Sequence, residues 1–150
     1  MDYQFLCHRH KVQLSEHLEA AGPIWSSWMR QGKASLAEGE LAQAVQYFGC
    51  AFDLALMKVE RFTGHAEHDG KRHIDRLLEA VSALAKGLAM SGHLALRREY
   101  LGKVCAVLQR EQQRTPLLAD RLPQPDDAIG LMFNAGWVTT PAADTRQHLN

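Results

Sequence analysis

The sequence predicts an all-α protein built from antiparallel helical hairpins. Apolar residues recur at i, i+3 and i+4 through four successive stretches between residues 23 and 113. Breaks that contain glycine separate these stretches, and the one proline before residue 115, Pro23, stands where a helix would begin. With 150 residues and 46% hydrophobic content, the chain has the size of one ordinary domain, whose core needs no metal or disulfide.

The first hairpin is expected between Pro23 and about Thr63. Its first helix runs from Pro23 to Ala37, and Gly39 then interrupts the pattern. The apolar rhythm resumes and continues to about Thr63, which predicts a long return helix. The repeating positions of this return helix are Leu41, Ala44, Val45, Phe48, Ala51, Phe52, Ala55 and Val59.

A second hairpin is expected after a polar loop over residues 64–72. Its first helix runs from His73 to a break at Ser91 and Gly92. The return helix continues from there to about Gln113. The two hairpins therefore have the same plan, with a glycine between the helices of each.

The two ends of the chain are predicted to differ. Near the N-terminus, the spacing of four apolar residues predicts a short helix that covers the first hairpin: Phe5, Val12, Leu14 and Leu18. From residue 115 onward, four prolines and one short apolar cluster predict an irregular tail, docked on the helices or on a partner. We therefore expect a helical domain over residues 1–114 and an irregular tail over residues 115–150.

Six residues of the first hairpin stand at a characteristic spacing: Trp28, Gly32, Gly39, Ala44, Phe48 and Ala51. Their order resembles the signature of the tetratricopeptide repeat, a helix–turn–helix unit, over residues 25 to 58. The small residues would let two helices approach closely while Trp28 and Phe48 fill the remaining space. Residues 78 to 111 resemble a degenerate copy, offset by 53 residues, so the resemblance implies a short array of two units.

The resemblance also implies a binding role. In tetratricopeptide repeats, ligand peptides lie along a concave surface lined by the first helix of each unit. The corresponding positions here predict a groove for a segment of another protein that is both acidic and apolar. The residues expected to line it are Met29, Arg30, Lys33, Lys86 and Met90. With Trp28 assigned to the repeat core, Trp25 is expected to pack on the N-terminal helix or to anchor a partner.

Composition and motifs argue against other classes of protein. Lys plus Arg and Asp plus Glu each total 17, so no basic field favours nucleic acid. No apolar run is long enough for a membrane span, and three scattered cysteines are typical of reduced thiols in a cytoplasmic protein. No glycine-rich phosphate loop, nucleophile motif or H-E-x-x-H is present. We expect a non-catalytic adaptor or scaffold without a cofactor.

Two alternatives stay open. If the N-terminal segment crosses the loop after the first hairpin, a tetrahedral zinc site could form from Cys7, His10, His65 and His68. The chain would then be a small structural or sensor protein. If instead the second return helix leaves an apolar stripe uncovered, the protein would be a self-associating structural subunit. That stripe is Leu96, Tyr100, Val104 and Val107.

Overall fold

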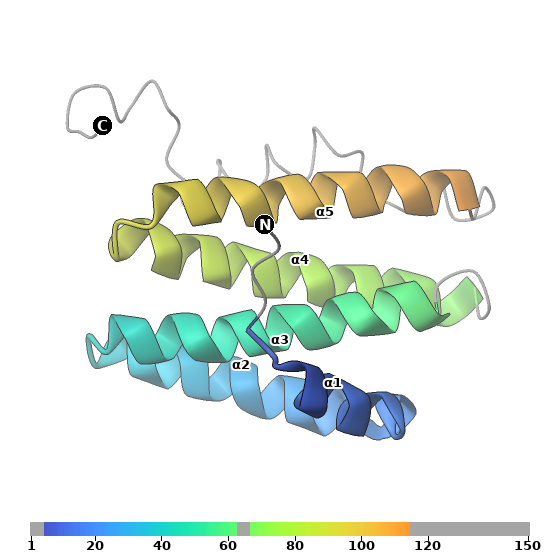
Figure 1. Cartoon of the computed structure of the whole chain (residues 1–150), viewed down its shortest axis with the longest axis horizontal. Coiled ribbons are helices and arrows are strands. Elements are labelled where there is room, and N and C mark those ends of the chain that lie inside the picture. Colours follow the sequence, from blue (N-terminus) through green and yellow to red (C-terminus); the bar gives the residue numbers. More distant parts are fainter. Residues whose placement is uncertain (1–4, 63–66, 115–150) are drawn as a thin grey trace.

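The structure, a computed structural model, describes residues 5–62 and 67–114 and is all-α, without a strand among these residues. Four long helices run up and down in chain order, and each lies beside the next (Figure 1). They are α2 (Gly22–Ala37), α3 (Leu41–Phe62), α4 (Glu67–Met90) and α5 (Leu94–Arg114). A short α1 (His8–Ser15) and a 3₁₀ turn, η1 (Leu18–Ala20), precede them. The expected tail over residues 115–150 lies outside the described residues.

The predicted helix boundaries agree with the structure to within a few residues, with one exception. Residues 67–72 were expected to be loop but form the first turns of α4. The prediction was wrong because it required an apolar period. Glu, Lys and Arg are themselves good helix formers, and a helix end needs no buried stripe to extend.

The first helix of each hairpin ends in the same way. Gly39 has φ +78° and Gly92 has φ +83°, both in the left-handed region that glycine adopts without a steric penalty. The N–H of Glu40 bonds the Ser35 carbonyl at 2.9 Å, and the N–H of His93 bonds the Leu88 carbonyl at 2.8 Å. Both ends are Schellman motifs, 53 residues apart, which turn the chain back after α2 and α4.

Helices α2 and α3 approach closely at small residues. A Cβ on Gly32 would lie 2.5 Å from the Phe48 ring, so only glycine fits at this crossing. Ala44, Ala51 and Phe48 are buried on the facing side of α3. The sequence-based expectation for these four residues is confirmed.

The central pair, α3 and α4, carries most of the core. Val59, Ile74, Leu77 and Leu84 are fully buried, and a Cβ on Gly87 of α4 would lie 3.1 Å from Val45 of α3. None of the described helices is both long and apolar enough to cross a membrane.

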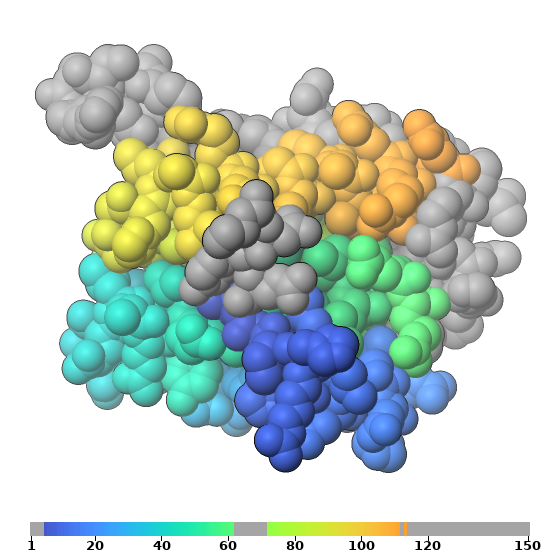
Figure 2. Space-filling view, in the orientation of Figure 1, coloured from blue at the N-terminus to red at the C-terminus, as the bar shows by residue number. Residues whose placement is uncertain are grey.

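The N-terminal segment is held on α3 by a buried carboxylate. The backbone N–H groups of Phe5 and Leu6 both donate to Oδ2 of Asp53, at 2.7 and 2.9 Å. The Phe5 ring stacks at a tilt on Tyr100 of α5, with centroids 5.5 Å apart. Helix α1, the expected short N-terminal helix, then lies on the surface over α3 (Figure 2).

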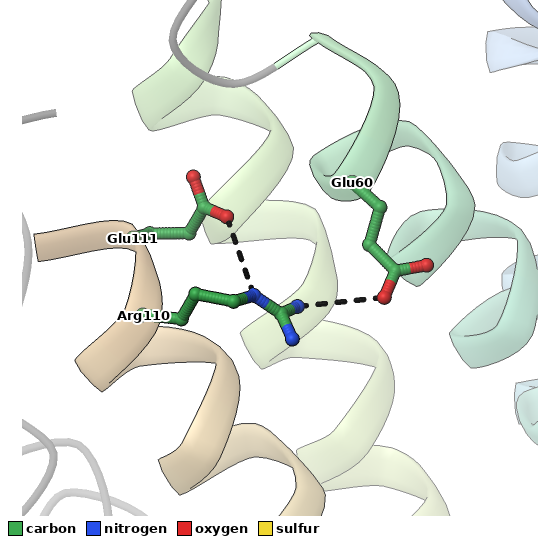
Figure 3. A network of polar contacts seen from close by, with 3 residues as sticks. All are labelled: Glu60, Arg110 and Glu111. Carbon is green, nitrogen blue, oxygen red and sulfur yellow. Dashed lines mark hydrogen bonds and ion pairs between the residues drawn. The ribbon is translucent and has the colours of Figure 1, made fainter. Parts of the chain in front are cut away.

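Helix α5 also reaches α3 directly. Arg110 of α5 lies between two carboxylates, with Nη2 3.4 Å from Glu60 Oε2 and Nε 3.9 Å from Glu111 Oε2 (Figure 3). Together with the contacts of Phe5, this places α3 and α5 on one face of the molecule. Contacts between α2 and α4 lie on another face.

Candidate functional site

The candidate site is the α2–α4 face, the surface formed by the sides of α2 and α4 that meet each other. Lys33 Nζ lies 3.6 Å from Glu79 Oε2, and both side chains are more than half exposed. About two turns earlier in α2 and one turn earlier in α4, the Arg76 guanidinium lies over the Trp25 ring, 5.4 Å from its centroid. The first helices of the two hairpins thus contact each other through these side chains and contribute to one surface.

The predicted partner-binding residues fall into two groups. Met29 is 3% exposed and belongs to the core, so its side chain does not contribute to a surface groove. That part of the prediction needs correction: Met29 lies one turn after Trp25, on the stripe that α2 buries. Arg30 and Met90 are exposed, and Lys86 is half-buried.

The roles expected of the two tryptophans are reversed. Trp25 is 7% exposed and packs in the core beneath Arg76. Trp28 is only half-buried and lines an open pocket beside α1. Both residues lie on the same side of α2, and the sequence did not show which of them faces α3 and α4.

Sequence reasoning missed three cationic residues at one end of the face, which we call the cationic cluster: Lys58, Arg72 and Arg76. Arg72 had been assigned to a loop, whereas the structure places it one turn before Arg76 on α4. Lys58 comes from α3 and is buried, with its Nζ 4.0 Å from the position that a Cβ would take on Gly22. One signal in the sequence was available: Lys58 stands four residues after Leu54 and three after Ala55, on the apolar stripe of its helix.

The positive charges of the cationic cluster repel one another. Burial lowers the pKa of Lys58 below its ordinary value, and the neighbouring Arg76 and Arg72 lower that pKa further. Each effect disfavours the protonated ammonium. The protein therefore holds a cation at this place against both desolvation and like-charge repulsion.

A second candidate is an open, mainly apolar pocket of about 690 Å³ between α1, α2 and α3. Phe5, Leu14, Ile24 and Trp28 form much of its wall. Four side chains at its rim or wall could bear chemistry: Cys7, His10, His17 and Cys50. Burial raises the pKa of Cys50, so its thiol stays protonated and fits core packing better than a redox role.

The structure brings together only half of the predicted zinc set. Cys7 Sγ lies 3.4 Å from His10 Nδ1, and both residues are exposed. His65 lies outside the described residues, and the side chain of His68 does too. Within the described part of the chain, no group of three or more potential ligands surrounds a single point. Zinc binding stays a prediction.

The stripe proposed for self-association is not an open surface. Tyr100, Val104 and Val107 are at most 4% exposed, and Leu96 is half-buried. Phe5 and Phe52 both contact Tyr100 within the chain, the latter edge to face with centroids 5.0 Å apart. The stripe itself therefore gives no reason to expect a dimer.

Comparison of the chain with protein-family models, with curated proteins and with solved structures found no match.

Proposed function

We propose that this chain is a tetratricopeptide-like interaction module that binds an acidic, partly apolar segment of another protein along the α2–α4 face. Its action is binding alone, as an adaptor or scaffold. Two hairpins whose first helices share a surface provide the arrangement that such modules use. The equivalent C-caps at Gly39 and Gly92 support treating the hairpins as two copies of one unit.

The observation that carries the proposal is the charge of the face. Helix α2 contains Arg30 and Lys33 and no acidic residue. Helix α4 adds Arg72, Arg76 and Lys86, and it also places one acidic residue on the face, Glu79, which pairs with Lys33. The whole chain has a formal net charge of zero, so this excess of cations is local and not a property of the protein as a whole. A negatively charged segment would be attracted to this face in preference to others.

The face also offers apolar contacts at its far end. Met90, the last residue of α4, is 53% exposed. Methionine is unbranched and adapts to partners of different shape. A partner with acidic residues followed by an apolar anchor would match this order of groups.

Affinity capture with the purified protein tests the proposal. Lysate proteins retained by the wild type are compared with those retained by Lys33→Glu combined with Lys86→Glu, and are identified by mass spectrometry. We expect one partner or a few to be lost from the double variant, because the reversed charges repel an acidic segment. Stability should hardly change, since the pair Lys33–Glu79 is exposed.

Arg9→Glu combined with Arg98→Glu is the matched control. It makes the same change of net charge on α1 and α5, where both arginines are exposed. A partner that both double variants lose equally depends on net charge alone. That result, or a partner that neither loses, would refute binding on the α2–α4 face.

One observation favours a second candidate function. The contact of 3.4 Å between Cys7 and His10 provides two groups of the kind that hold zinc. Metal analysis of protein purified without a histidine tag decides the matter. About one equivalent of zinc, lost on Cys7→Ser, would establish the zinc protein, whereas metal-free folded protein would dispose of it.

A further inference from the structure

The start of α2 lies against the cationic cluster. The position that a Cβ would take on Gly22, the first residue of α2, is 3.5 Å from Nη1 of Arg76 and 4.0 Å from Nζ of Lys58. Arg72 lies one turn before Arg76 on α4 and contributes to the lowered pKa of Lys58. Two cations from two helices, Lys58 and Arg76, therefore lie against the first turn of a third helix, and the exposed Arg72 adds its charge nearby.

Lys58 has no counterion among the residues that the structure describes. Its residue is 5% exposed, and it makes no hydrogen bond or ion pair with the part of the chain that the structure describes. A buried ammonium without a partner is costly, so proteins normally pair such a group or neutralise it. Among the described side chains of α4, Asp75 is exposed and lies about 100° around the helix from Arg76, and Glu79, one turn after Arg76, pairs with Lys33.

The first turn of α2 is itself positive and uncapped. Ala21, at the N-cap, provides no side-chain acceptor, and the first turn contains no acidic residue. The leading N–H groups of a helix lack intrahelical acceptors and attract anions together with the helix dipole. The indole N–H of Trp25, one turn further on, also lacks a partner among the described residues. The leading N–H groups of α2 and the side chains of Lys58 and Arg76 therefore lie at one small region.

We propose that this region is a binding site for a phosphoryl dianion, formed by Lys58, Arg72 and Arg76 with the first turn of α2. A carboxylate would leave two of the three positive charges uncompensated, whereas a dianionic phosphoryl group compensates two and presents three acceptor oxygens to donors from several directions. Such groups bind at helix N-termini for the same reasons. The inference rests on the proposed function only for the source of the phosphoryl group, a phosphorylated residue of the partner segment.

Thermal unfolding with inorganic phosphate tests the site without any partner. The purified protein is titrated with phosphate at pH 7.5 against sodium chloride of equal ionic strength. At about ten times the dissociation constant we expect the midpoint to rise by roughly 3–5 °C, and to keep rising with the logarithm of the phosphate concentration. Lys58→Met keeps the buried stem and removes the charge, so phosphate affinity should fall by about tenfold or more.

Two further variants keep the result interpretable. Lys58→Arg keeps the charge and should retain most of the phosphate effect. Arg98→Gln removes an exposed cation from α5 and should bind phosphate as the wild type does. An equal phosphate effect in wild type and Lys58→Met would overturn the proposal, and so would an equal effect of acetate and phosphate in the wild type.

The source of the phosphoryl group is tested separately by calorimetry. A short acidic peptide is compared with the same peptide carrying one phosphoserine. Binding of only the phosphorylated form, at least tenfold tighter than inorganic phosphate, would show that a protein segment supplies the group. Equal affinity of phosphopeptide and inorganic phosphate would still support the site but assign it to free phosphate. Failure of the capture experiment alone would leave the phosphate result standing.

Discussion

Two buried charges on α3, five residues apart, have opposite surroundings. Asp53 faces the N-terminal segment and accepts two backbone hydrogen bonds from it, at 2.7 and 2.9 Å. Lys58 faces α2 and α4 and has two arginines as its charged neighbours. Burial shifts both pKa values toward the neutral form, raising that of Asp53 and lowering that of Lys58. Within residues 5–62 and 67–114, Asp53 has a partner that offsets part of this cost, and Lys58 has none.

The difference separates a structural charge from a candidate binding charge. The carboxylate of Asp53 attaches a segment that has no helical hydrogen bonds of its own at this point, and the segment covers Tyr100. Lys58 makes no hydrogen bond or ion pair with the described residues, so it holds no segment in place. A buried polar group is tolerated when it is satisfied, and a bound anion would satisfy Lys58.

Removing the acceptor at Asp53 should have the largest effect. In Asp53→Ala the N–H groups of Phe5 and Leu6 lose their acceptor, and each unsatisfied group costs about 1–3 kcal/mol. We expect a loss of at least about 2 kcal/mol of stability in urea unfolding, together with proteolytic cleavage near the N-terminus.

Asp53→Asn is the matched control for this change. The amide oxygen can accept from the same two N–H groups, and the buried charge is gone. Stability at neutral pH should stay within about 1 kcal/mol of the wild type. If Asn destabilises as much as Ala, the charge itself holds the segment and the comparison between the two sites fails.

Supplying Lys58 with a built-in partner should have a smaller, opposite effect. Gly22→Asp places a carboxylate at the first position of α2, where the present backbone has no positive φ and a Cβ meets Arg76 only at an ordinary 3.5 Å. We expect a gain of about 1 kcal/mol, a rise in midpoint of about 2–4 °C, and loss of the response to phosphate.

Gly22→Asn is the control for Gly22→Asp, because it distinguishes the effect of the carboxylate charge from the effect of a polar side chain on the helix N-terminus. It has nearly the same shape and should neither stabilise to the same extent nor abolish the phosphate effect. A Gly22→Asp protein that still responds fully to phosphate would place the anion elsewhere.

The fold was accessible from the sequence because its signals are local. The period of 3.6 residues defined four long helices, and Gly39 and Gly92 marked their turns. The close contact of Gly32 with Phe48 followed from the spacing of small and aromatic residues. The start of α4 was missed because a charged helix end carries no apolar period.

The candidate site was less accessible because it depends on the rotation of each helix. The apolar period places Trp25 and Trp28 on the same side of α2. A small rotation of α2 about its axis would decide which of them contacts Arg76, and the period does not define that rotation. Because the rotation of α2 was not known, Met29 was predicted to line the groove, although it is buried. Lys58 and Gly22 are 36 residues apart, and only tertiary packing brings them together.

The smallest expected effect is a pair of opposite pH dependences. The pKa of Asp53 is raised from its ordinary 3.8, mainly by burial, although Phe5, Leu6, Lys11 and Lys103 oppose the shift. The native state then binds protons more tightly than the unfolded chain, so stability falls as pH rises from 3.8 through the raised value. In Asp53→Asn this fall should disappear.

For Lys58 the sign reverses. Its pKa is lowered from 10.5 by burial, then by Arg76 and Arg72, so the native state releases its proton first and stability rises with pH from the lowered value up to 10.5. Urea unfolding between pH 8 and pH 10.5 should show this rise in the wild type and not in Lys58→Met. Saturating phosphate should flatten it, because a bound anion restores the charged form of Lys58 and moves its pKa back up. If phosphate does not change this increase of stability with pH, the anion does not reach Lys58. Asp53 and Lys58 would then have different neighbours, but Lys58 would not be a binding residue.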